Sequence, residues 1–211
     1  MEFSSLSRFV NSPPPKIIPG ERCEFCAAPI GDHHSHLVDL KDRRLMCACR
    51  PCYLLFTPTG AAQGRYRGVP DRYVYLTDFT LTSAQWDELQ IPISLAFFFF
   101  NSTTQTMAAF YPSPAGATES LLPLGTWEEI VAANPVVASL EPDVEALLVF
   151  RKKDSPQQSY VVPIDACYEL VGLIRKSWKG FDGGEEAWNN IAQFFDGIRA
   201  KSSEAGSQKV S

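Results

Sequence analysis

Two Cys-x-x-Cys pairs near the N-terminus constrain the fold of this chain more than any other feature. They are Cys23-Glu-Phe-Cys26 and Cys49-Arg-Pro-Cys52. Each pair places two thiolates on one side of a tight turn, and two facing pairs supply the four ligands of a tetrahedral metal site. We therefore predict that these four cysteines bind one metal ion, with sulfur atoms within about 4 Å of one another.

The ligand set alone does not separate zinc from iron. Four thiolates complete a structural zinc site with no open position, and they also suit a rubredoxin-type iron. Zinc is the first expectation and iron the alternative.

Other potential ligands surround these pairs. Cys47 is an alternative ligand to Cys49 or a redox partner for it, but we interpret it as a small buried residue because free cysteines are usually buried and inert. The three histidines of the chain are His33, His34 and His36. A role in metal exchange is the alternative to a polar turn, which we favour because four thiolates already complete a site.

Composition excludes several classes of protein. Of the 211 residues, 45% are hydrophobic and 20% are charged, which suits a globular core. The net charge of −5 argues against a general nucleic-acid binder. The longest apolar run, Ile93–Phe100, is too short to span a bilayer, and residues 1–15 lack a signal-peptide pattern. We predict a cytoplasmic protein without a membrane span, in which clustered cysteines bind metal rather than form disulfides.

The chain divides into four segments by composition. A Ser/Pro-rich disordered leader covers 1–20, the four-cysteine metal-binding module covers 21–58, a larger body covers 59–198, and a small-residue polar tail predicted as disordered covers 199–211.

The sequence of the body predicts both strands and helices. Short strands are expected at 73–76, 93–100, 104–111, 145–151 and 159–164, and Thr82 begins a helix with a capping-box pattern. A further helix begins at Thr126, and Asp165 is the expected N-cap of a helix over 166–178, followed by one over 185–199. The predicted fold class is α+β: a mostly antiparallel sheet with C-terminal helices on one side, preceded by the small metal-binding module.

Positive charge is concentrated beside the cysteines. Residues 41–72 carry a net charge of +5 and the rest of the chain −10. Such a separation predicts docking to an acidic protein surface or to nucleic acid, and an ordinary solvated face is the equal alternative. The prediction that we carry forward is the acidic protein surface. The predicted docking residues are Lys41, Arg43, Arg44, Arg65 and Arg67.

A proline-containing segment, Tyr111–Ser120, is predicted as an ordered loop beside the cysteine module or a cleft of the body. Its polar groups make it a candidate ligand loop, and a plain strand-to-helix connection is the alternative. The candidate residues are Ser113, Gly116, Thr118 and Ser120.

Several sequence segments carry a family resemblance. CEFCAAPI, LMCACRPCYLLF, FYPSPAGATES, PDVEALLVFR and PIDACYELVGLIRKSW together resemble an uncharacterised bacterial family found with gene clusters for high-affinity uptake nickel–iron hydrogenases. The resemblance covers about residues 21–198 and implies a context of assembly, maturation or electron delivery for a metalloenzyme. It carries over no catalytic residue.

Three functions are compatible with these observations. The first is a metal-binding accessory protein that assists a hydrogenase-type metalloenzyme and binds a protein partner such as a hydrogenase subunit. The second is a rubredoxin-like iron electron carrier, and the third is a zinc-ribbon nucleic-acid-binding protein. Enzymatic activity ranks last because no acid–base constellation, catalytic residue or organic cofactor site is recognisable.

Overall fold

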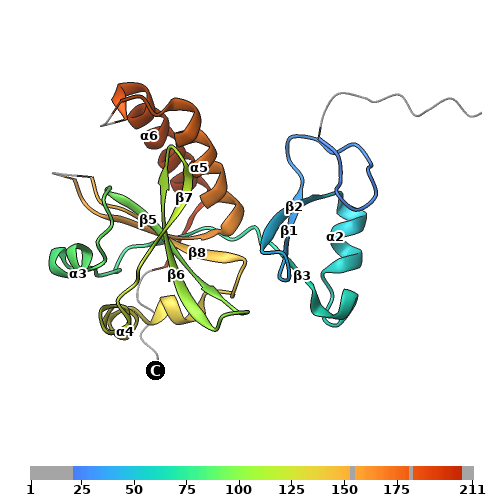
Figure 1. The fold of residues 1–211 in the computed structure, drawn as a ribbon, viewed down its shortest axis with the longest axis horizontal. Helices are drawn as coiled ribbons and strands as arrows, with labels where there is room; N and C mark the ends of the chain where they lie inside the picture. The colour runs from blue at the N-terminus through green and yellow to red at the C-terminus, as the bar shows by residue number, and fades with distance from the viewer. Residues whose placement is uncertain (1–20, 153–154, 181–182, 206–211) are drawn as a thin grey trace, which may run out of the picture.

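A computed structural model describes residues 21–152, 155–180 and 183–205. The predicted leader, residues 1–20, and the last six residues of the predicted tail lie outside the described residues. The chain forms two parts, a small N-terminal module and a larger body that contains a sheet and most of the helices (Figure 1).

The module is a three-stranded antiparallel sheet with one short helix. The strand order is β2-β1-β3. Its elements are β1 Ser35–Asp39, β2 Arg44–Ala48, α2 Arg50–Phe56, the 3₁₀ turn η1 Ala61–Gly64 and β3 Tyr66–Gly68. Residues 59–68, which the sequence assigned to the body, therefore lie in the module. The aromatic ring of Tyr66 accounts for this, because it packs edge-on against Phe25 and Phe56 near the cysteines.

The body contains a seven-stranded sheet of order β10-β4-β9-β8-β5-β6-β7. Every neighbouring pair is antiparallel except β10 and β4. The strands are β4 Val74–Leu76, β5 Leu95–Asn101, β6 Thr106–Ser113, β7 Gly116–Ser120, β8 Glu145–Phe150, β9 Gln158–Pro163 and β10 Ser203–Ala205. The predicted α+β class with a mostly antiparallel sheet is confirmed.

Helices cover both faces of this sheet, not one as the sequence analysis expected. The helices α5 Ile164–Ser177 and α6 Gly184–Lys201 lie on one side, and α3 Ser83–Glu88, α4 Leu124–Ala133 and the 3₁₀ turn η2 Pro135–Ser139 accompany the other (Figure 1). Successive side chains of β5 point to opposite faces. Phe97 joins the core beneath α5 and α6, whereas Phe98 stacks on Trp127 of α4.

The ends of the helices partly follow the sequence predictions. The capping box at Thr82 is confirmed, with Gln85 as its reciprocal partner. The expected N-cap at Asp165 is wrong: α5 begins at Ile164 after Pro163, and Asp165 lies in its first turn. At the C-terminus, α6 continues to Lys201 and β10 pairs with β4, so regular structure extends through residues 199–205, where the sequence predicted the start of a disordered tail.

The segment predicted as a ligand loop is a β-hairpin. Tyr111–Ser113 ends β6 and Gly116–Ser120 forms β7, with a tight turn between them. The Ser113 hydroxyl accepts from the Ala115 N–H and donates to the Gly116 carbonyl, and it also lies 3.0 Å from the Thr118 hydroxyl. Ser120 donates to the Leu89 carbonyl. The hydroxyl groups of Ser113 and Thr118 stabilise the hairpin, and that of Ser120 fixes the hairpin to the end of α3.

Within the described residues, every helix is too short or too polar to cross a lipid bilayer.

Candidate metal centre

The two cysteine pairs are brought together by one strand and one helix start. The first pair lies in a turn in which the Ala27 N–H donates to the Cys23 carbonyl. Glu24 N–H donates to the carbonyl of Cys47 in β2, which fixes this turn against the sheet. Cys49 is the N-cap of α2 and Cys52 lies in its first turn, so both pairs face one point.

The four thiols converge as a metal site requires. The sulfur atoms of Cys23, Cys26, Cys49 and Cys52 all lie within 4.8 Å of one another. The Cys26 and Cys49 sulfur atoms are 3.6 Å apart. Tetrahedral coordination with metal–sulfur bonds of about 2.3 Å needs edges of about 3.8 Å, so small side-chain rotations suffice. The donor set therefore fits a zinc or iron ion.

The module contributes little apolar core of its own around these thiols. Its buried cluster consists of Cys23, Leu37, Ala48 and Cys52. Partly buried aromatic rings close one side, with Phe25 stacked on Phe56 at a centroid distance of 4.5 Å. A module with so small a core depends on additional bonds for stability.

The pKa values of Cys23 and Cys52 are shifted in opposite directions. Burial acts to raise the pKa of Cys23, but hydrogen bonds from the backbone of Cys49, Cys26 and Phe25 outweigh it and lower the pKa to about 6. Burial raises the pKa of Cys52, and its hydrogen bonds to the neighbouring sulfur atoms raise it further. Because metal binds thiolates, ion binding would displace the protons that these thiols carry.

Cys47 does not join this group. It lies directly opposite His36 in the β1–β2 register, and it forms a second group with His34 and His36, in which one ligand atom from each residue lies within 4.8 Å of the others. Burial raises the pKa of Cys47, and the carboxylates of Glu21 and Glu24 raise it further. His33 is exposed and belongs to neither group.

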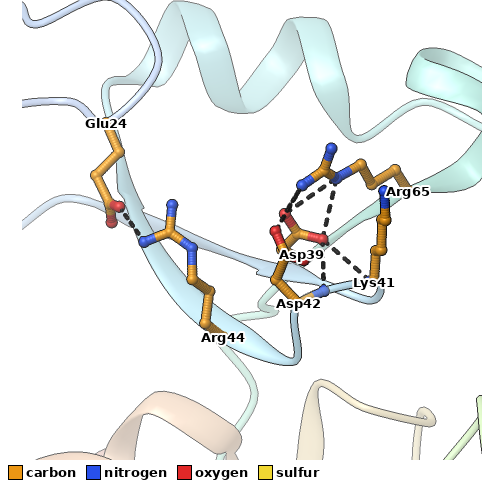
Figure 2. Close-up of polar contacts among 6 residues, drawn as sticks. All are labelled: Glu24, Asp39, Lys41, Asp42, Arg44 and Arg65. Carbon is orange, nitrogen blue, oxygen red and sulfur yellow. Dashed lines mark hydrogen bonds and ion pairs between the residues drawn. The ribbon is translucent and has the colours of Figure 1, made fainter.

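Three of the five predicted docking residues are held by carboxylates of the chain itself. Arg65 donates to Asp39, which is 1% exposed, and to Asp42, while Arg44 pairs with Glu24 (Figure 2). Arg67 donates to Asp143 and to the Pro142 carbonyl in the body. Lys41 and Arg43 are exposed in the turn between β1 and β2, and within the described residues their side chains have no ion-pair partner.

The carboxylates in these contacts were not identified from the sequence. Asp39 accepts from the backbone N–H groups of Lys41 and Asp42 as well as from Arg65, so it fixes the turn and the arginine together (Figure 2). Hydrogen bonding by Arg65, against the opposing effect of burial, holds the pKa of Asp39 below its ordinary value. Buried acidic residues in a hydrophobic strand, such as Asp39 in SHLVDL, are the signal that could have found them.

Two cavities lie where the module meets the body. One, of about 320 Å³, is lined by Val38 and Leu45 of the module and by Phe99, Phe110 and Tyr168 of the body. The other is an open, polar groove of about 850 Å³ that includes His34, His36 and Cys49 on one side and Asp165 on the other. The hydroxyl-bearing residues Ser113, Thr118 and Ser120 line neither cavity.

Comparison with known proteins gives one result. Residues 22–202 match the model of a family of unknown function, DUF5947. Searches of curated proteins and of solved structures gave no significant match.

Proposed function

The chain belongs to this family of unknown function, and we propose that it is a metal-binding accessory protein whose four cysteines hold one structural zinc ion. The observation that carries the proposal is the convergence of four thiols from two separate turns within 4.8 Å. Four thiolates satisfy zinc completely and leave no position for substrate, as in sites that stabilise a fold. The small apolar core of the module supplies the physical need for such a site.

Iron is the alternative ion at the same ligands. One observation favours it: Cys26 is exposed and Cys49 is half-buried, so electrons would have a short path to a partner surface. Metal analysis of natively purified protein, with a visible absorption spectrum, tests the two. One zinc per four-cysteine group and no visible band supports the proposal, because zinc is d¹⁰. One iron per chain with visible thiolate-to-iron absorption would contradict the zinc proposal and support the electron-carrier function.

The accessory role is supported by how the module is attached. Arg67 reaches Asp143 and the Pro142 carbonyl, and Arg72 reaches the buried carboxylate of Glu145. These bonds place the metal module beside the body and leave the turn residues Lys41 and Arg43 exposed. We propose that this turn contacts an acidic surface of a partner, and the resemblance suggests a hydrogenase-type metalloenzyme as that partner.

Binding to hydrogenase subunits at low and high salt tests the partner proposal. The variant Lys41→Glu/Arg43→Glu should weaken binding at low salt, because exposed charges act over about 8 Å at physiological salt. The variant Arg175→Glu/Lys176→Glu makes the same charge change on the exposed face of α5 and should bind as the wild type does. Equal binding by all three proteins would show that the interface lies outside this turn. If none of them binds, hydrogenase subunits are excluded as the partner.

A nucleic-acid-binding role receives less support. Arg44, Arg65, Arg67 and Arg72 all face carboxylates within the chain. Much of the local positive charge is therefore compensated, whereas phosphate binding requires uncompensated lysines and arginines.

A further inference from the structure

A second group of metal-ligating side chains lies next to the four cysteines. His34, His36 and Cys47 each offer one ligand atom, and these atoms lie within 4.8 Å of one another. We propose that they form a second, separate metal site, which binds one divalent first-row transition ion of the zinc type and leaves one coordination position open. The proposal does not depend on which ion the four cysteines hold.

The hydrogen bonds of the two imidazoles leave the same nitrogen available on each ring. His36 Nδ1 lies 2.8 Å from the Asp165 carboxylate, and His34 Nδ1 lies 2.8 Å from the Gly31 carbonyl oxygen. Both partners are acceptors, so both Nδ1 atoms carry the proton and donate it. The neutral rings then have their lone pairs on Nε2, the form in which a histidine binds metal. A metal-binding histidine usually donates a hydrogen bond from its other ring nitrogen, here Nδ1, to a carboxylate or a backbone carbonyl.

One of these lone pairs has no partner in the protein. His34 Nε2 is buried without a hydrogen bond, the only side-chain nitrogen or oxygen in this condition among residues 21–152, 155–180 and 183–205. The His34 side chain is 8% exposed. A buried polar atom without a partner costs about 1–3 kcal/mol, and a metal ion bound at Nε2 would remove that cost.

The strand pairing fixes the third ligand. His34 directly precedes β1, and its ring centroid lies 4.6 Å from that of His36. Cys47 is the direct cross-strand neighbour of His36. Two imidazoles and one thiolate make a three-ligand set of the kind that keeps a fourth position for water or an exchangeable ligand. The polar groove of about 850 Å³ is lined by both histidines but not by Cys47, so the histidine side of the site borders it.

The body contributes to this site through Asp165, which is a positioning residue. Its carboxylate comes from the first turn of α5 and orients the His36 ring from across the module–body boundary. Metal affinity at the second site therefore depends on the docking of the body, whereas the four-cysteine site is built from the module alone.

Titration of the metal-free full chain with Co²⁺, under reducing conditions, tests the proposal. Cobalt is a visible substitute for zinc, and the absorption counts ions at thiolate-containing sites. We expect two ions per wild-type chain and one per chain in both Cys47→Ala and His34→Ala. His33→Ala changes the neighbouring exposed histidine and should still bind two. Asp165→Ala should retain both sites but weaken the second by about 10–100-fold.

The four-cysteine site provides the internal control. A variant that keeps the spectrum of cobalt bound by four thiolates has a folded module, so loss of the second ion is then local. Cys26→Ser removes a ligand of the first site and should bind neither ion, because the module that carries both sites then unfolds. Saturation of the wild type at one ion with the spectrum of cobalt bound by four thiolates, or two ions bound by Cys47→Ala, would overturn the second site. Failure of the four-cysteine site alone would contradict the proposed function and leave this inference standing.

Discussion

His36 donates a hydrogen bond from Nδ1 to the carboxylate of Asp165 at 2.8 Å, and this contact joins the first strand of the module to the first turn of α5. The Arg67–Asp143 ion pair joins the two parts a second time. Both contacts cross the boundary between the module and the body. A substitution on one side of either contact therefore also removes a partner from the other side.

Loss of a true ligand should unfold the module, and loss of the neighbouring thiol should not. Cys49→Ser opens the four-sulfur site and removes metal-linked folding energy, which reaches about 10–16 kcal/mol in small zinc-dependent peptides. Cys47→Ser leaves that site complete. Amide hydrogen exchange in β1 and α2 measures the difference: protection should be lost in the first variant and kept in the second. The reverse pattern would show that Cys47 is the ligand.

The buried carboxylate of Asp39 should stabilise the module by about 2–3 kcal/mol at neutral pH. Asp39→Asn keeps an oxygen for the N–H groups of Lys41 and Asp42 but removes the charge that faces Arg65. Urea unfolding of the zinc-loaded protein measures the loss. Asp42→Asn removes the 51% exposed partner of the same arginine and should cost less than about 1 kcal/mol. Equal losses would contradict a special role for Asp39.

The same carboxylate should titrate below the ordinary aspartate range. Because its pKa is lowered in the folded chain, its stabilisation is fully present above the unfolded value of about 3.9 and is lost as the pH falls through the folded value. The stability difference between wild type and Asp39→Asn should therefore be flat from about pH 5 to pH 8. A carbon-detected NMR titration of the Asp39 carboxyl group checks the sign, and a pKa above 3.8 would contradict it.

Gly68 should not tolerate a methyl group. A Cβ atom there would lie 2.7 Å from the Tyr53 hydroxyl oxygen and 2.8 Å from a Thr57 methyl carbon, because β3 approaches α2 closely. We expect Gly68→Ala to destabilise the module by about 1–3 kcal/mol in thermal or urea unfolding. Gly31→Ala, in the same module with no atom within 4 Å of the added carbon, is the matched control and should unfold like the wild type.

The Arg67–Asp143 contact should keep the module docked. Arg67→Gln removes the charge that faces a carboxylate only 8% exposed, whereas Arg43→Gln changes an arginine without such a partner. The connection over residues 69–73 should be cleaved several times faster by protease in the first variant than in the second, since local opening sets the cleavage rate. Equal cleavage of both would mean that other contacts hold the two parts together.

The ligand spacing and the strand patterns were predictable from the sequence because they are local. The four cysteines, the capping box at Thr82 and the strand pairs of the body all depend on short-range patterns. The two-sided cover of the sheet was missed, although Ala146–Val149 is an unbroken apolar run whose side chains all are buried. Such a run, without alternation, indicates a strand covered on both faces.

Contacts between distant residues could not be read in the same way. Nothing near Arg67 in the sequence indicates Asp143, and nothing near His36 indicates Asp165. The charge count over residues 41–72 was correct, but the pairing of most of those arginines with carboxylates depends on the fold. The hairpin that contains the proline-containing segment depends on the fold in a related way, because it is defined by pairing between β6 and β7.

The parallel pairing of β10 with β4 has a consequence for the order of events during synthesis. One edge of the body sheet is completed by residues 203–205, which are synthesised long after the module is complete at residue 68. The four-cysteine site can therefore acquire its ion while the body is still being translated, since N-terminal units fold first. The proposed second site reaches its full affinity later, because Asp165 is synthesised nearly one hundred residues after the module is complete. The two sites would then bind their metal ions in sequence, in an order set by the progress of translation.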